Sequence, residues 1–503
     1  MISLAVAPPP PFAAAREQFE AILSFVETDD AFMMSHGDLE AALAAQGREL
    51  LRRLLQDHLD LRADREPRLE VVDAAGVEHA SVETGHQRSL TTVFGEVDVT
   101  RQAYRKRGEA NLHPADGRLN LPREEYSHGL RKQVAVEVAR DSYEEVVAAI
   151  ERTTAVRIGK RQVEELAIRS AVDFDAYYRA CSRAPCALED VLVLSCDGKG
   201  IVMRPEALRE GTRKAAAKTR QKLATRLSRG EKGNRKRMAE VGCVYDLAPV
   251  PRTPEQILRR PDDQEVAPPA PKAKAKWVTA SVVDDAATVV AQIFEEAERR
   301  DPDHQRTWIA LVDGNNHQID LINREAHKRQ LTVHIVVDFI HVLEYLWKAA
   351  WCFHTEGDRA AEVWVRTHAM AVLRGKASQV AGAMRRSATR RGLASARREG
   401  VDTCATYLLN KRPYLGYPQA LQEGWPIASG VIEGACRHLV KDRLDLTGAR
   451  WGLAGAEAVL KLRALRTNGD FEEYWRFHLL REKRRVHQSR YLRNSIPGDN
   501  DLP

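Results

Sequence analysis

The stretch VLVLSCDGKGIVM, residues 191–203, combines the pattern of a buried strand with a single carboxylate, Asp197. The apolar and β-branched residues before Asp197 predict a strand. A carboxylate in the middle of a buried strand would lose its hydration at a high cost in free energy. We therefore expect the strand to end at Asp197, where the side chain faces a crevice and a cation can neutralise its charge.

Four more segments downstream have the composition of strands. They are residues 238–250, 276–283, 307–315 and 331–339, and a helical pattern lies between the second and third of them, at 285–300. Three successive strands, followed by helix, strand, helix and strand, indicate a mixed α/β sheet of five strands.

Acidic residues stand near later elements as well. Asp313 follows the fourth strand in LVDGN, Asp338 follows the fifth in VVDFIH, and Glu433 lies on a helix that starts near Ser429. Any one of these aspartates alone is more commonly a turn or helix-capping residue. Together, carboxylates from distant segments are the ligands that hard divalent cations prefer. Two such ions about 4 Å apart can activate a nucleophilic oxygen and stabilise the leaving oxygen of a phosphodiester.

The identity of the second acid depends on the strand order. In an RNase H-like sheet the fourth strand lies beside the first, and the fifth lies one position further out. Asp313 is therefore expected next to Asp197. Asp338 forms a D-x-x-H pair with His341. This pair either supports the site indirectly or caps the helix that begins near Ile340.

Positive charge is concentrated in one part of the chain. The formal net charge is +6, but residues 204–237 hold thirteen basic residues and three glutamates. Arg213 and Lys214 belong to this stretch, and Lys199 lies just before it. A concentrated basic patch is typical of nucleic-acid binding, and the alternative is a solvated charged insertion. The residues outside 204–237 therefore carry a small net negative charge.

The N-terminal part has helical and hairpin patterns. Residues 16–62 predict helix, residues 87–107 predict a β-hairpin, and residues 141–171 predict two helices separated by a short break. The second helix of that pair begins with Lys160 and Arg161, which makes the pair a helix-turn-helix candidate for major-groove contact. A plain helical hairpin fits the same pattern.

Composition excludes several classes of protein. The chain has 503 residues, no apolar run long enough to span a membrane, and seven scattered cysteines without a CxxC pair. A disulfide framework is not expected, and a reducing cytoplasm is the default compartment. Cys436 and His438 lack further zinc ligands nearby, so no zinc site is expected. The N-terminal residues predict a loose tail and no signal peptide.

Five motifs in order resemble one family. SCDGKG (195–200), RPEALREGTRKAA (204–216), LVDGNNHQ (311–318), VVDFIHVLEYLW (336–347) and SGVIEGACRHLVKDRL (429–444) are together similar to transposases of bacterial insertion sequences of the ISKra family. These belong to the DDE superfamily and are related to Mutator-type transposases. The resemblance covers roughly residues 85–480.

The resemblance implies an RNase H-like core with an Asp, Asp, Glu triad. Matched motif by motif, the triad is Asp197, Asp313 and Glu433, which would act as both catalytic residues and metal ligands. Two magnesium ions, with manganese as a substitute, are the implied cofactors. The D-x-x-H signature of Mutator-like relatives matches Asp338 and His341, as supporting residues.

The expected fold class is α/β, with an RNase H-like mixed five-stranded sheet, an all-α insertion and a mainly helical N-terminal DNA-binding region. The expected organisation is a helical region for possible dimerisation (1–85), a DNA-binding region (86–185), the first part of the core (186–340) with its basic insertion (204–237), the all-α insertion (341–425), C-terminal core helices that carry Glu433 (426–485) and a tail (486–503).

The implied activity is divalent-metal-dependent cleavage at the ends of the element and strand transfer into target DNA. The implied partner is double-stranded DNA, contacted by Lys199, Arg213, Lys214, Lys160 and Arg161, with a homodimer or higher oligomer and no membrane. A bacterial, nucleoid-associated cytoplasmic protein is expected. There are two alternatives: a metal-dependent nuclease without strand transfer, and a non-catalytic, domesticated DNA-binding regulator.

Two tryptophans flank the helix that carries Glu433. Trp425 and Trp451 could stack on a base or pack in the core.

Overall fold

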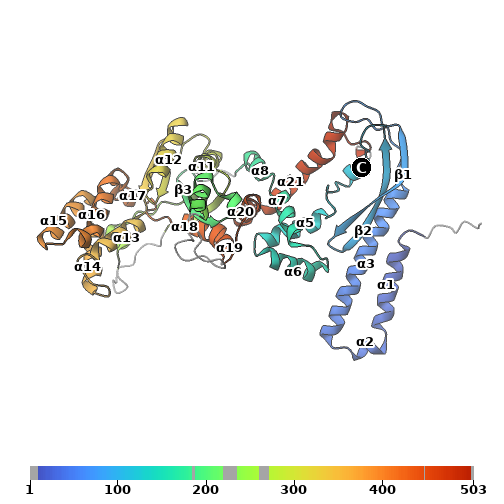
Figure 1. Ribbon diagram of the computed structural model, residues 1–503, viewed down its shortest axis with the longest axis horizontal. Coiled ribbons are helices and arrows are strands. Elements are labelled where there is room, and N and C mark those ends of the chain that lie inside the picture. Colours follow the sequence, from blue (N-terminus) through green and yellow to red (C-terminus); the bar gives the residue numbers. More distant parts are fainter. Residues whose placement is uncertain (1–9, 184–186, 219–234, 260–270, 447, 500–503) are drawn as a thin grey trace, which may run out of the picture. The chain divides into compact units, whose positions relative to one another are not determined.

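Two units make up the chain in the computed structural model, which describes residues 10–183, 187–218, 235–259, 271–446 and 448–499 (Figure 1). The first unit comprises Met1–Arg179 and Gly469–Pro503, and the second comprises Ala180–Asn468. The sequence grouped residues 426–485 with the core. The division instead falls at Gly469, so the last long helix belongs with the N-terminal unit.

The second unit is built on a mixed sheet of five strands in the order β5-β4-β3-β6-β7. Strands β3, β4 and β5 are antiparallel, whereas β6 and β7 run parallel to β3. This confirms the five-stranded mixed sheet, and β6 lies directly beside β3. The strands are β3 (Val191–Val202), β4 (Lys236–Leu247), β5 (Ala273–Ser281), β6 (Trp308–Val312) and β7 (Val333–Val337).

Asp197 does not end its strand, contrary to the expectation from the sequence. Strand β3 pairs with β4 as far as Val202, but its pairing with β6 stops at Ser195. Asp197 therefore lies inside β3, at the point where the neighbouring strand has ended. The open flank left by β6 keeps this carboxylate half-buried, which removes the desolvation cost that predicted a strand end.

Helices cover both faces of the sheet. Helix α11 (Ala286–Arg300) packs on β3 and β4, where Gly242 leaves room for Ile293 and Val289. A side chain at Gly242 would lie only 2.6 Å from Ile293. Helix α18 (Gly430–Ala435) packs on β3 and β4, and α20 (Leu453–Asn468) packs on β5. Helix α18 carries Glu433, as the sequence predicted.

A buried ion cluster joins one end of the sheet to α11. Asp246 on β4 accepts hydrogen bonds from Arg300 at 3.0 Å and from Arg306 at 2.6 Å. Arg300 also pairs with the fully buried Glu296 at 2.9 Å. Since Arg306 lies two residues before β6, the cluster connects α11 and β4 to the start of β6.

The segment after β7 is helical, as expected. Helices α13, α14, α15 and α16 pack against one another (Figure 1). The helices are α13 (Phe339–Ala350), α14 (Arg359–Leu373), α15 (Ala377–Arg390), α16 (Ser395–Asn410) and α17 (Tyr417–Gln422). The second unit also contains α9 (Glu210–Lys218), α10 (Pro254–Ile257), α12 (Asn316–Lys328) and α19 (Asp442–Leu444), with a π-helical turn at Cys436–Lys441.

The first unit begins with a helical hairpin. The predicted helix at 16–62 is divided into α1 (Ala13–Val26), α2 (Asp29–Met33) and α3 (His36–Asp64). The divisions arise because the side chains of Thr28 and Ser35 cap new helices, by accepting hydrogen bonds from Ala31 and Asp38. Helix α3 then packs its Leu59 against the β-hairpin of β1 (Ser81–Thr92) and β2 (Gly95–Arg105), which confirms the predicted hairpin.

Six further helices of the described part of the chain, the C-terminal helix α21 among them, belong to this unit. Helices α5, α6 and α7 pack against one another, and residues 155–159 connect α6 to α7. The helices are α4 (Pro114–Arg118), α5 (His128–Val138), α6 (Tyr143–Thr154), α7 (Lys160–Ser170), α8 (Phe174–Ala180) and α21 (Phe471–Val486). The fully buried Arg131 of α5 pairs with Glu482 of α21, and this ion pair joins segments more than 300 residues apart.

Within the described ranges, no helix is both long enough and apolar enough to cross a membrane.

Candidate functional site

The predicted acids gather at one edge of the five-stranded sheet. Ser195 is opposite Leu311, so Asp197 and Asp313 each lie two residues beyond the last pair of β3 and β6. Val312 is opposite Val337, so Asp313 and Asp338 directly follow the last pair of β6 and β7. The carboxyl ends of parallel strands meet at the same edge of a sheet, and the register therefore brings three aspartates to that edge.

Two hydrogen bonds orient Asp197. Its Oδ1 accepts from the backbone N–H of Gly198 at 2.6 Å, and its Oδ2 accepts from the thiol of Cys436 at 3.4 Å. Burial, followed by the negative charge of Asp197, raises the pKa of the Cys436 thiol well above its ordinary value. The thiol therefore stays protonated and remains a donor at neutral pH. Cys436 directly follows α18, so this contact fixes the glutamate-bearing helix to β3.

A tight turn and the helical insertion position Asp313. Its Oδ1 accepts from the backbone N–H of Asn315 at 2.7 Å, and its carbonyl oxygen accepts from the hydroxyl of Tyr407 at 3.0 Å. Gly314 between them has a φ of +95°, which a residue with a side chain adopts only with strain. Tyr407 lies on α16, so the helical insertion contacts the backbone of the site directly.

Asp338, His341 and Glu433 form a compact group. One carboxylate oxygen of each acid and one ring nitrogen of His341 all lie within 4.8 Å of one another, and such a group could hold a metal ion. Asp338 is fully buried, and its Oδ1 caps α13 by accepting from Ile340 at 2.6 Å. Its Oδ2 accepts from the backbone N–H of Ser429 at 2.8 Å and from the hydroxyl of the same residue.

Asp338 therefore has the capping role that the sequence left as one alternative. It also holds Ser429, which precedes α18, and this positions the helix that carries Glu433. His341 lies one turn into α13, with Nδ1 3.5 Å from the carboxylate of Glu344. Glu433 is exposed, and no described residue donates a hydrogen bond to its side chain. Its carboxylate is free to take a ligand.

The expected triad is not a closed cluster in this structure. Within the described ranges, Glu433 shares a possible metal group with Asp338 and His341, whereas Asp197 and Asp313 lie outside that group. The two aspartates do act on a common neighbour. Burial, followed by Asp313, Glu240 and Asp197, raises the pKa of Cys196 to about 12. Asp197 and Asp313 thus contribute negative charge to the same part of β3.

Glu240 is a further carboxylate beside Asp197. It lies on β4 opposite Gly198, and its Oε2 is 3.5 Å from the place where a side chain on Gly198 would begin. Burial raises the pKa of Glu240, and the negative charge of Asp197 adds to the rise. Local sequence patterns did not indicate a role for Glu240 or the contact from Cys436, because both depend on which segments become neighbours.

The predicted DNA-contacting side chains lie on separate elements. In the second unit, Lys199 is half-buried on β3, and Arg213 and Lys214 are exposed on α9, where Lys214 pairs with Glu210 at 2.6 Å. Residues 219–234 of the predicted basic insertion lie outside the described residues.

In the first unit, Lys160 and Arg161 are exposed at the start of α7 and pair with Glu144 and Glu165, each at 3.0 Å. Exposed pairs of this kind are weak, about 0–1 kcal/mol, so an incoming phosphate can replace the acid.

Two tryptophans pack in the core. Trp425 and Trp451 are 7% and 6% exposed, and the indole N–H of Trp451 donates to the carbonyl oxygen of Leu444 at 3.0 Å. These contacts favour the packing alternative over base stacking.

No protein-family model matches this chain, and no curated protein is significantly similar to it.

Proposed function

We propose that this protein is a DNA transposase of an insertion sequence, with an RNase H-like core and Asp197, Asp313 and Glu433 as its catalytic acids. The observation that carries the proposal is the register of the sheet. Asp197 and Asp313 come from neighbouring strands, β3 and β6, at one edge, and α18 with Glu433 packs on β3. This arrangement agrees with the resemblance of the motifs to the ISKra family, in a bacterial, nucleoid-associated cytoplasmic setting.

The donor set fits hard divalent cations. Asp197, Asp313 and Glu433 offer only carboxylate oxygens, which magnesium and manganese prefer. When bound, such ions would supply the positive charge that offsets the charge of the phosphodiester. Asp197 is already oriented by Gly198 and Cys436, and Asp313 by Asn315, so little rearrangement of these side chains is needed.

Glu433 is the exposed member of the proposed triad. Asp338 holds Ser429 at the start of α18, and His341 lies within the same group as Glu433. In this proposal, Asp338 and His341 are positioning residues that keep Glu433 at the edge of the sheet. To hold a cation together with Asp197 and Asp313, Glu433 would turn away from His341.

The basic side chains would hold the DNA backbone. Lys199 lies two residues after Asp197 on the same strand, which places its charge beside the acids. Arg213 and Lys214 on α9 would extend that contact, and Lys160 and Arg161 would bring α7 into a major groove. Arg213 and Arg161 are both exposed, so neither must leave a buried contact to reach DNA.

The experiment that tests the function uses DNA that carries the two flanking ends of the element, magnesium and the purified full chain. We expect cleavage at the ends and joining of the freed 3′ ends to a second DNA, both lost with EDTA and restored by manganese. Cleavage without joining would favour the nuclease alternative. Binding of the ends without either reaction would favour the regulator.

A homodimer through the N-terminal helical hairpin is part of the proposal. Helices α1, α2 and α3 bury only Ala15, Ala31 and Leu59, one residue each. On α2, which connects α1 to α3, Phe32 and Met33 are 80% and 86% exposed. Two such hairpins packed together would form a four-helix bundle and cover these side chains.

We expect Phe32→Asp with Met33→Asp to convert a dimer into a monomer, because each introduced carboxylate would be buried at the interface. Light scattering coupled to gel filtration measures the mass. Glu40→Ala, an exposed change on α3, is the matched control and leaves the dimer intact. A double variant with the same mass as a dimeric wild type would show that the interface lies elsewhere.

A further inference from the structure

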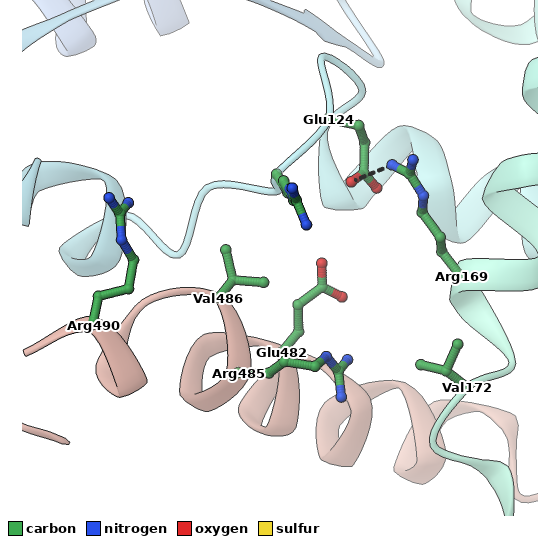
Figure 2. Close-up of a pocket in the computed structure, with 8 residues that line it drawn as sticks. Glu124, Arg169, Val172, Glu482, Arg485, Val486 and Arg490 are labelled. Carbon is green, nitrogen blue, oxygen red and sulfur yellow. Dashed lines mark ion pairs between the residues drawn. The ribbon is translucent and has the colours of Figure 1, made fainter. Parts of the chain in front are cut away.

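A basic cavity in the first unit is a second candidate site. Its volume is about 650 Å³, and four arginines from separate segments line it (Figure 2). Arg123 precedes α5, Arg169 lies at the end of α7, and Arg485 and Arg490 lie at and beyond the end of α21. The other charged residues of the wall are Glu124 and Glu482.

The two glutamates are already neutralised from within the protein. Glu124 pairs with the buried Arg131 at 2.9 Å and with Arg169 at 2.7 Å. Glu482 also pairs with Arg131, and burial by itself would raise its pKa. Hydrogen bonds from His478 and Arg131 overcome that effect and hold the pKa of Glu482 well below its ordinary value. Both acids are therefore already paired with arginines of the protein.

Several arginines of the cavity wall keep hydrogen-bond donors for a ligand. Arg123 is exposed, and it forms no ion pair or hydrogen bond with any described residue. Arg485 shares Asp173 with Arg481, and among the described residues the side chain of Arg490 donates to the backbone oxygen of Asn111, at 2.9 Å. Since the arginines around the cavity outnumber the carboxylates, the cavity keeps a positive potential and donors that face a ligand.

If α7 enters a major groove, the cavity would lie close to a DNA backbone. Arg161 and Arg169 lie eight residues apart on α7, about 12 Å along the helix axis at 1.5 Å per residue. The major groove of B-DNA is about 12 Å wide. A helix that enters the groove with Arg161 would therefore bring Arg169 and the cavity to the flanking strand. Val172 and Val486 in the wall offer apolar contact for a sugar (Figure 2).

We propose that this cavity binds a phosphate of the DNA backbone and anchors the strand that flanks the groove contacted by α7. The inference rests on the proposed DNA-binding function. It adds a site that is independent of the acids of the second unit, and Arg123 is its principal free donor.

The experiment compares wild type with Arg123→Ala, by fluorescence anisotropy on double-stranded DNA from about 50 to 300 mM salt. Arg123 has no partner among the described residues, so its removal should leave the fold intact, whereas Arg169→Ala would remove one of the two arginines that pair with Glu124. We expect about tenfold weaker binding near 50 mM salt and a salt slope smaller by about one, equally for element ends and unrelated DNA. Arg123→Lys should retain most of the affinity.

Arg140→Ala is the matched control, because Arg140 is an exposed arginine of the same unit that pairs with Glu137 at 3.0 Å. It should leave the slope unchanged. A slope for Arg123→Ala equal to that of wild type would overturn the inference, even if wild type cleaves and joins DNA. If inorganic phosphate raises the melting temperature of wild type and not of Arg123→Ala while DNA affinity is equal, the ligand is a free anion. If wild type binds no DNA, the proposed function fails together with the inference.

Discussion

Asp197→Asn is expected to lower the rate of DNA cleavage by more than about 10³-fold, which corresponds to about 4 kcal/mol of transition-state stabilisation. Asparagine keeps the size of the side chain but removes the negative charge that would hold a divalent cation. Asp313→Asn and Glu433→Gln are expected to have effects of the same size. Cleavage and joining are measured on DNA with element ends in magnesium.

Binding to DNA separates catalysis from folding in this series. Each variant should bind the element ends at least as tightly as wild type, because each substitution removes a negative charge that repels the backbone. Asp320→Asn is the matched control, since Asp320 is an exposed aspartate on α12, seven residues after Asp313, and has no proposed role. It should cleave at the wild-type rate.

The same series of variants tests whether Asp338 and His341 are positioning residues or metal ligands. As positioning residues, Asp338→Asn and His341→Ala should lower activity by about 10–100-fold, less than the loss of a ligand. If Asp338→Asn is inactive and Asp313→Asn is active, the second acid belongs to β7 and the group of Asp338, His341 and Glu433 is itself the metal site. The structure is compatible with that outcome, because one ligand atom from each of these three side chains lies within 4.8 Å of the other two.

The second large effect is expected on stability. Asp246→Ala should lower the free energy of unfolding of the second unit by about 3–5 kcal/mol, the range typical of breaking a buried ion pair by removal of one partner. Asp246 is 1% exposed and pairs with Arg300 and Arg306. Without it, the buried guanidinium of Arg306 loses its carboxylate and that of Arg300 keeps only Glu296, so α11 and the start of β6 lose their common anchor on β4.

Urea denaturation followed by circular dichroism measures this change. Glu255→Ala is the control in the same unit, because Glu255 pairs with Arg374 at the surface, with both side chains about half exposed. That exposed pair should be worth no more than about 1 kcal/mol. If the two variants lose equal stability, the cluster around Asp246 is not the anchor of the sheet.

The sequence alone determined the elements and their types. Alternation and β-branched residues predicted five strands, and the helical period predicted α11 and the insertion after β7, because these patterns depend on neighbours a few residues away. The positions of Asp313 and Asp338 at strand ends followed from the same patterns. These patterns did not predict that the first long helix is divided near Thr28 and Ser35. Both are ordinary capping residues, but the apolar pattern continued through them.

Tertiary structure alone decided which of these side chains meet. Asp197 lies inside β3 because β6 ends early, and strand register is set by the pairing of distant segments. Cys436 contacts Asp197, and Glu433 meets Asp338 and His341, only after α18 packs on the sheet. The arginine cavity unites Arg123 with Arg485, more than 350 residues later. Local sequence fixes dihedral preference and periodicity, whereas contacts between distant residues depend on burial shared by the whole core.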